Sequence, residues 1–97
     1  AELSDGGTHT GNYLISADGT YGNADVSKVT TINGNVTINV PNAAESDVVN
    51  LQNLKITGTI TVNFGAGTVN TTNVTGTAVK IQNVGSHCFN AGRGSSF

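Results

Sequence analysis

The sequence predicts an all-β protein: a small parallel β-helix (β-solenoid) of about three coils with an irregular N-terminal arm. Apolar and polar residues alternate with a period of two in the runs Val36–Val40, Ile60–Phe64 and Val79–Ile81. This period is the pattern of a strand with one buried face. Val, Ile and Thr are abundant in the same runs, and their β-branched side chains suit a pleated sheet.

A weak internal repeat is the further observation behind the solenoid. The run that starts at Gly34, Gly-Asn-Val-Thr-Ile-Asn-Val, resembles the run Gly-Thr-Ile-Thr-Val-Asn-Phe that starts at Gly58. Asn53-Leu54 is similarly followed by Asn73-Val74. A recurrence of about 20 to 24 residues fits one coil of a β-solenoid, which holds two or three short strands. Asn residues at like positions in successive coils are expected to stack into a hydrogen-bonded ladder.

An antiparallel β-sandwich or jelly roll is the alternative fold, because strands spaced by roughly 8 to 12 residues with Gly turns would also fit. Asn33-Gly34 is the one Asn-Gly pair that lies between two alternating runs. Gly58 and Gly76 instead precede Thr and an apolar residue, which favours a bend entering a new strand over a two-residue hairpin. We therefore prefer the parallel β-helix, with the sandwich left open.

The chain divides into three regions. Residues 1–28 contain turn signals around a short apolar strand, Tyr13–Ile15, and are expected to form an N-terminal arm or cap. Residues 29–85 are the predicted solenoid. Residues 86–97 are rich in Gly and Ser and are expected to form a tail.

Composition limits the class of protein. Charged residues make up 10% of the 97 residues and the formal net charge is −2, so the chain offers no basic field for nucleic acid. Membrane insertion is not expected, because no apolar run approaches the roughly 20 residues of a membrane span. The abundance of Thr, Asn, Gly and Val is common in extracellular β proteins, so we expect a secreted or cell-surface protein.

Residues 29–85 carry a resemblance to a known group. They contain the runs Gly-Asn-Val-Thr-Ile-Asn-Val-Pro, Val-Asn-Leu-Gln-Asn-Leu-Lys-Ile-Thr-Gly-Thr-Ile-Thr-Val and Gly-Thr-Val-Asn-Thr-Thr-Asn-Val-Thr-Gly-Thr. This pattern resembles the short right-handed parallel β-helix modules of bacterial cell-surface proteins, within the pectate-lyase-like β-helix group. The resemblance implies a surface or extracellular β-helix and does not imply lyase activity.

We expect no enzymatic activity, metal or cofactor. A polysaccharide lyase needs clustered acids for Ca²⁺ or a basic side chain beside a groove. Lys55 and Lys80 are the bases that could stack on one face, and they are more typical of solubility residues; a lyase-like enzyme is the distant alternative. His9, His87 and Cys88 lack the spacing of a zinc site.

Threonines that alternate along the predicted strands suggest another activity. Stacked on one flat face, their hydroxyls could bind ice or a polysaccharide, although Thr is also an ordinary solvent-facing strand residue. The candidates for this face are Thr57, Thr59, Thr61, Thr75 and Thr77.

Self-association is the leading functional expectation. A solenoid has two open ends that expose strand edges and apolar core, and a free monomer needs a polar cap on each. The arm could cover one end, whereas the other runs into the Gly/Ser tail without a charged cap. We therefore expect a non-catalytic structural protein that pairs with copies of itself in an oligomer or fibre, with Cys88, Phe97 and Tyr13 as candidate intermolecular contacts. A carbohydrate- or ice-binding module is the alternative, with polysaccharide as the other partner.

Overall fold

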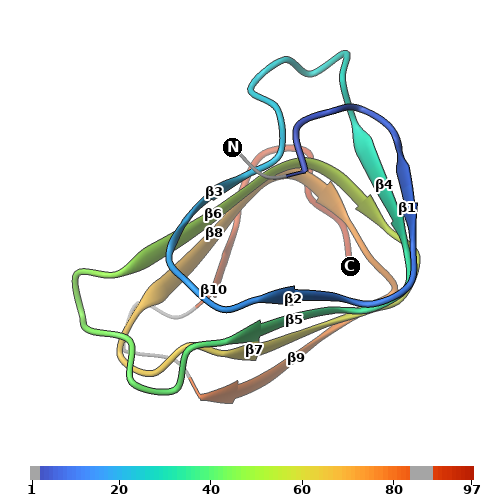
Figure 1. Ribbon diagram of the computed structural model, residues 1–97. Coiled ribbons are helices and arrows are strands. Elements are labelled where there is room, and N and C mark those ends of the chain that lie inside the picture. Colours follow the sequence, from blue (N-terminus) through green and yellow to red (C-terminus); the bar gives the residue numbers. More distant parts are fainter. Residues whose placement is uncertain (1–2, 84–88) are drawn as a thin grey trace.

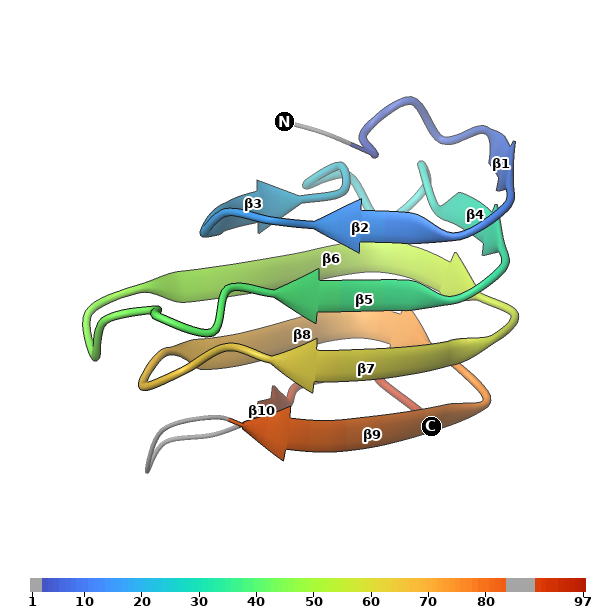
Figure 2. The ribbon, with the colours of Figure 1, turned by 60° about the horizontal axis from the view of Figure 1, so that its bottom comes forward.

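The computed structural model describes residues 3–83 and 89–97, in which there is no helix and all strand pairs are parallel. The strands stack as a β-solenoid of about three turns. The parallel β-helix is therefore confirmed, and the antiparallel sandwich is wrong. Figure 1 looks along the axis and shows a triangular cross-section, while Figure 2 shows the stacked layers from the side.

The triangle has three faces, each named here after its first strand. The β2 face holds four strands in the order β2 (Tyr13–Ile15), β5 (Val36–Asn39), β7 (Thr59–Asn63) and β9 (Ala78–Asn83). The β1 face holds β1 (Thr8–Thr10), β4 (Thr30–Asn33) and the ends of the two long strands, β6 (Val48–Ile56) and β8 (Thr68–Thr75). The β3 face holds β3 (Gly19–Tyr21), the first parts of β6 and β8, and β10 (Phe89–Ala91).

The two long strands turn the corner between the β3 face and the β1 face at an asparagine. Asn53 in β6 and Asn73 in β8 have φ angles of 52° and 54°, in the left-handed region. Asparagine tolerates that conformation better than most non-glycine residues because its short polar side chain bonds locally. Each strand therefore bends sharply, so one strand serves two faces.

Inward-facing side chains of successive coils form columns along the axis. Val36 lies against Ile60, and Ile32 against Ile56, because the strands pair in register. The core is aliphatic apart from two aromatic residues, and its buried apolar members are Ile15, Tyr21, Ile32, Val36, Ile38, Ala43, Val49, Leu51, Leu54, Ile56, Ile60, Val62, Phe64, Val69 and Val74. Burial of these columns drives the stacking of the coils.

The solenoid extends further in both directions than residues 29–85. β1, β2 and β3 form a coil of their own that pairs with the next one, and β10 pairs with β8. Two long connections hide this first coil in the sequence: residues 22–29 join β3 to β4, and residues 40–47 join β5 to β6. The register offsets are therefore uneven: Thr8 pairs with Thr31 and Thr30 with Leu54, whereas Gly19 pairs with Val49 and Leu54 with Val74. Strands of three residues are also too short to show an alternation.

Candidate functional site

The two ends of the solenoid are the places where its regular pairing stops. In the part of the chain that the structure describes, β1, β2 and β3 pair with one neighbour each, and so do β9 and β10. We call the first end the head and the second the tail. Each presents one row of backbone groups that the sheet itself does not pair.

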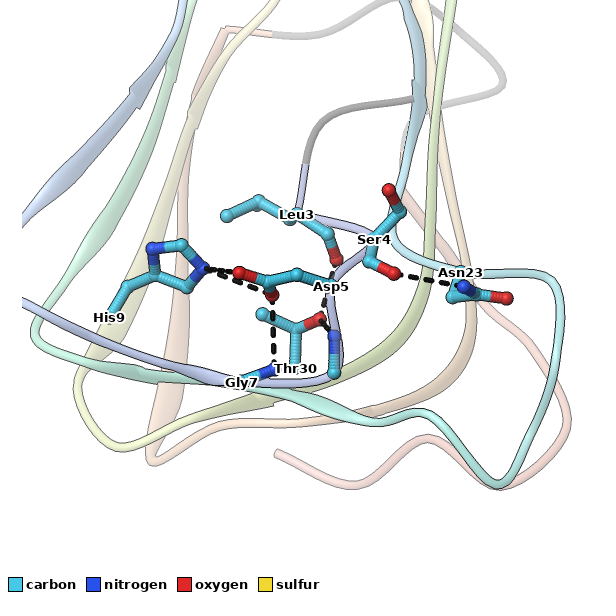
Figure 3. Close-up of polar contacts among 8 residues, drawn as sticks. Leu3, Ser4, Asp5, Gly7, His9, Asn23 and Thr30 are labelled. Atoms are coloured by element: carbon cyan, nitrogen blue, oxygen red, sulfur yellow. Dashed lines mark hydrogen bonds and ion pairs between the residues drawn. The ribbon is translucent and has the colours of Figure 1, made fainter.

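A short arm, residues 3–7, lies over one corner of the head. The hydroxyl of Thr30 accepts a hydrogen bond from the Gly6 amide at 3.1 Å and donates one to the Leu3 carbonyl at 2.6 Å. The Asn23 amide group donates to the Ser4 carbonyl at 2.9 Å. Figure 3 shows these contacts, which tie the arm to the corner between the β3 face and the β1 face. The arm is therefore a partial cap.

The arm is also tied to β1 by an Asp–His pair. The Nε2 atom of His9 lies 3.1 and 3.2 Å from the two carboxylate oxygens of Asp5 (Figure 3), and it must carry the hydrogen because a carboxylate only accepts. The Gly7 amide donates to Asp5 Oδ1 at 3.0 Å. The Gly7 hydrogen bond, followed by that of His9, lowers the pKa of Asp5 below its ordinary value of 3.8. Both side chains remain open to solvent.

A cavity of about 370 Å³ opens at the head, at the corner where β1 leads into β2. Its walls are Leu3 of the arm, His9, Tyr13, Ile32 and residues 10–12. We call it the head pocket. It forms because His9 occupies the core-facing position above Ile32, with which it is in register. The imidazole turns toward Asp5 and is itself exposed, whereas Ile32 beneath it is fully buried.

The tail exposes the last layer of the core. Ile81 is in register with Val62, yet Ile81 is 50% exposed whereas Val62 is fully buried. Val79 and Phe89 are only partly buried against the same core. An apolar side chain that would be covered by one more coil is thus in contact with solvent.

Phe97 closes part of the tail from below. Ser96 bridges to Thr75, so that Phe97 continues the pairing beneath Gly76. A side chain at Gly76 would come within 3.3 Å of the Phe97 ring, so the glycine leaves room for it. The ring also meets Phe89 edge-on, with centroids 5.5 Å apart and planes at 73°. Phe97 nevertheless remains 37% exposed.

The threonines considered for an ice- or carbohydrate-binding face do not share one face. Thr59 and Thr61 lie on β7 in the β2 face, and Thr75 lies in the β1 face beside Lys55. Thr57 and Thr77 stack at the corner between these faces, where the Thr77 hydroxyl donates to the Thr57 carbonyl at 2.6 Å. The five hydroxyls are therefore spread around a corner.

The expected asparagine ladders are present and are more numerous than one. On the β3 face, Asn90 donates to Asn70 at 3.0 Å and Asn70 donates to Asn50 at 3.3 Å. At the corner, Asn73 donates to Asn53 at 2.9 Å. A shorter ladder on the β2 face joins Asn63 to Asn39 at 3.1 Å. In each ladder the Nδ2 group of the later coil donates to the Oδ1 atom of the earlier coil.

The remaining candidates from the sequence lie apart. Lys55 is on the β1 face and Lys80 on the β2 face, so the expectation that they could stack on one face is wrong. His87 and Cys88 lie outside the described residues. Within residues 3–83 and 89–97, no cluster of three or more His, Cys, Asp or Glu side chains could hold a metal ion. The same residues include no helix long and apolar enough to cross a membrane.

Sequence reasoning placed Tyr13 and Phe97 among the contact candidates, and they lie at the head pocket and at the tail. It missed Leu3, Ile81 and the Asp5–His9 pair. The spacing of four residues between Asp5 and His9 was the available signal for the pair. Nothing in the sequence marks that pair as the edge of a cavity.

No family model, curated protein or solved structure matches this chain. The β-helix is shown by the strand pairing alone.

Proposed function

We propose that this chain is a non-catalytic structural protein that associates with copies of itself through the ends of its solenoid, forming an oligomer or fibre. The observation that carries the proposal is the apolar surface exposed at the tail, together with the pocket that opens at the head. Ile81 and Phe97 are exposed at the tail, and the head pocket opens between Leu3, Tyr13 and Ile32. Covering these groups removes apolar surface from water, which stabilises the complex by about 25 cal/mol per Å².

Strand edges add to this attraction. The tail edge of β9 and the head edge of β2 belong to the same face, so a second copy can continue the sheet with backbone hydrogen bonds. Only 10% of the residues are charged, so electrostatic repulsion between copies is weak.

The size of the ends suggests weak, concentration-dependent association. A standard interface covers about 800 Å² on each partner, which would be about a sixth of the 4883 Å² accessible surface of this chain. The arm holds part of the head away from a partner, so the contact is smaller than that. We therefore expect monomers at high dilution and longer species as the concentration rises.

The setting of this role is proposed to be the outside of the cell. The surface is rich in uncharged Asn and Thr side chains, and the fold is the one that bacterial cell-surface β-helix modules of the pectate-lyase-like group would have. No catalytic group is required: the Asp5–His9 pair is exposed and holds the arm to β1.

Polysaccharide binding is a second candidate because of the ladder on the β3 face. Asn50, Asn70 and Asn90 present their amides in a row with the strand spacing of about 4.8 Å. Each amide has further hydrogens and lone pairs beyond those used in the ladder. A glycan array probed with the unaltered chain and with Asn70→Ala tests this candidate; equal signals for both would oppose it.

The main test measures the mass of the protein by sedimentation velocity over a hundredfold range of concentration. The unaltered chain should show a rising mass, and Ile81→Glu should remain monomeric because a carboxylate at the tail cannot be buried unpaired. Val26→Glu is the matched control, since Val26 is 70% exposed on the connection that projects away from the triangle in Figure 1. A monomer at every concentration, or equal losses for the two variants, would contradict the proposal.

A further inference from the structure

We infer that the association is polar: the tail of one copy docks on the head of the next, with the Phe97 ring entering the head pocket beside His9. This inference rests on the proposed self-association and adds its direction and its central contact. A second copy of this chain is the occupant of the pocket.

Strand register places the ring and the pocket on one line along the axis. His9 lies above Ile32, and Ile32 above Ile56. β6 pairs with β8 as far as Lys55 and Thr75, and the same register one residue further places Gly76 below Ile56. The bridge of Ser96 to Thr75 puts Phe97 beneath Gly76. Among the described residues, His9 and Phe97 are therefore the two outermost members of one column. A copy stacked coaxially, without rotation, brings Phe97 onto His9.

The corner of the triangle agrees with this column. Gly11 donates to the Asn33 carbonyl, Gly58 to the Gly34 carbonyl, and Thr77 to the Gly58 carbonyl, each at 3.0 Å. These residues form the corner between the β1 and β2 faces in successive coils. Residues 10–12 line the head pocket at this corner, and Phe97 lies against Gly76 at the same corner of the tail.

The pocket has the size and chemistry for an aromatic ring. An apolar cavity of about 150 Å³ accommodates benzene, and the head pocket measures about 370 Å³. Leu3 supplies an apolar wall and the buried Ile32 lies at the base, while Tyr13 and His9 supply ring edges and faces for aromatic contacts. The exposed part of Phe97 is thus complementary to the surface that the column predicts it will meet.

The asparagine ladders give the stack a direction. Asn90, Asn70 and Asn63 all donate toward the head, so amide dipoles in the ladders point the same way. Head-to-tail stacking keeps these dipoles aligned and keeps the strands parallel. A two-fold, tail-to-tail contact would oppose the dipoles and place the meeting strands antiparallel. A head-to-tail contact without closure produces an open fibre.

The arm occupies one corner of the head. Residues 3–7 lie over the corner between the β3 and β1 faces, where Thr30 and Asn23 hold them. Figure 2 shows this segment rising above the first coil. The pocket at the neighbouring corner stays open, so Phe97 is the side chain best placed to reach it.

Two blocked variants test the direction of the contact. Phe97→Ser removes the ring from the tail and keeps the head, whereas Thr10→Trp places a bulky side chain at the pocket rim and keeps the tail. Each variant alone should be monomeric by sedimentation velocity at concentrations where the unaltered chain associates. Their equimolar mixture should form a 1:1 dimer that grows no further, because both remaining ends are blocked. Circular dichroism of each variant verifies the β fold.

A second readout does not depend on the blocked variants being folded. The ring protons of His9 should shift upfield in NMR spectra as the unaltered chain is concentrated, because the Phe97 ring lies over the imidazole. A monomeric mixture of the blocked variants, or a rising mass without a His9 shift, would overturn the polar contact while leaving self-association intact. A monomeric unaltered chain would overturn self-association itself.

Discussion

Two asparagines make the strictest demands on single positions in this fold. Asn53 and Asn73 hold left-handed backbone conformations inside long strands, and their side chains bond along the axis. The Asn53 side chain is buried and also donates to the Asn23 carbonyl. Each residue therefore allows its strand to bend and also forms a hydrogen bond between coils.

Substitution at Asn73 can separate these two roles. Asn73→Ala keeps a Cβ atom at positive φ and loses the hydrogen bond to Asn53, so it should lower the free energy of unfolding by about 2–3 kcal/mol. Asn73→Gly loses the same bond but accepts the backbone angle, and should cost about 1 kcal/mol less than alanine. Urea unfolding followed by circular dichroism measures both. Equal costs would mean that the backbone angle contributes nothing.

The lowered pKa of Asp5 predicts how the hydrogen bonds of the arm respond to acid. Its pKa is lowered by the Gly7 amide and by His9, so the ionised carboxylate stabilises the arm. A lowered folded-state pKa means that this stabilisation is fully present above the ordinary value of 3.8 and is lost as pH falls through the folded value. NMR titration of the Gly7 amide should show its hydrogen bond holding from pH 7 to about 4 and weakening below. In Asp5→Asn this acid transition should be absent.

Two isoleucines in the same sheet show how much one covering coil contributes. Ile60 is fully buried on β7, whereas Ile81 on β9 is half exposed at the tail. Ile60→Ala should cost about 2–5 kcal/mol in the free energy of unfolding, because it leaves a cavity between layers. Ile81→Ala should cost a minor part of that in dilute solution. Chemical unfolding at low concentration makes the comparison, and similar costs would show that the tail is covered.

Alternation along the chain predicted the strands of the β2 face because these run straight. The periods around Val36, Ile60 and Val79 correspond to β5, β7 and β9. β1, β3 and β10 were not predicted, since three residues cannot display a period. β2 is equally short, but its apolar run Tyr13–Ile15 between turn signals was predicted and is confirmed. The connection of residues 40–47 further masks the link between β5 and β6.

The bend at Asn73 also helps to explain why the threonines expected on one face do not share it. In β8, Val69 and Thr71 point inward, and strict alternation would place Thr75 inward as well. Asn73 instead turns the strand onto another face, so Val74 is buried and Thr75 is exposed. A pattern read along the chain therefore mixes residues from two faces. The head pocket was equally out of reach, because Leu3 and His9 meet there only through the fold of the arm.

At the scale of the whole molecule, stability should fall from the middle coils toward the ends. Each coil of a solenoid contacts only its neighbours, so the outer coils have one partner where the inner coils have two. β6 and β8 share the longest run of paired residues, whereas β1 and β10 are held by three pairs each. Local opening should therefore begin at both ends.

Hydrogen exchange measured at two protein concentrations tests both this stability gradient and the proposed assembly. In dilute solution, amides of β1 and β10 should exchange first and those of β7 and the middle of β6 last. On concentration, slower exchange should appear in β1, β2 and β9, because a docked copy covers the head and tail edges. Amides of the connection at residues 22–29 should not change, since it projects away from the axis. Protection gained there, or on β6 alone, would mean that copies meet side by side on the outer faces, and the exposed tail and the head pocket would then have no part in association.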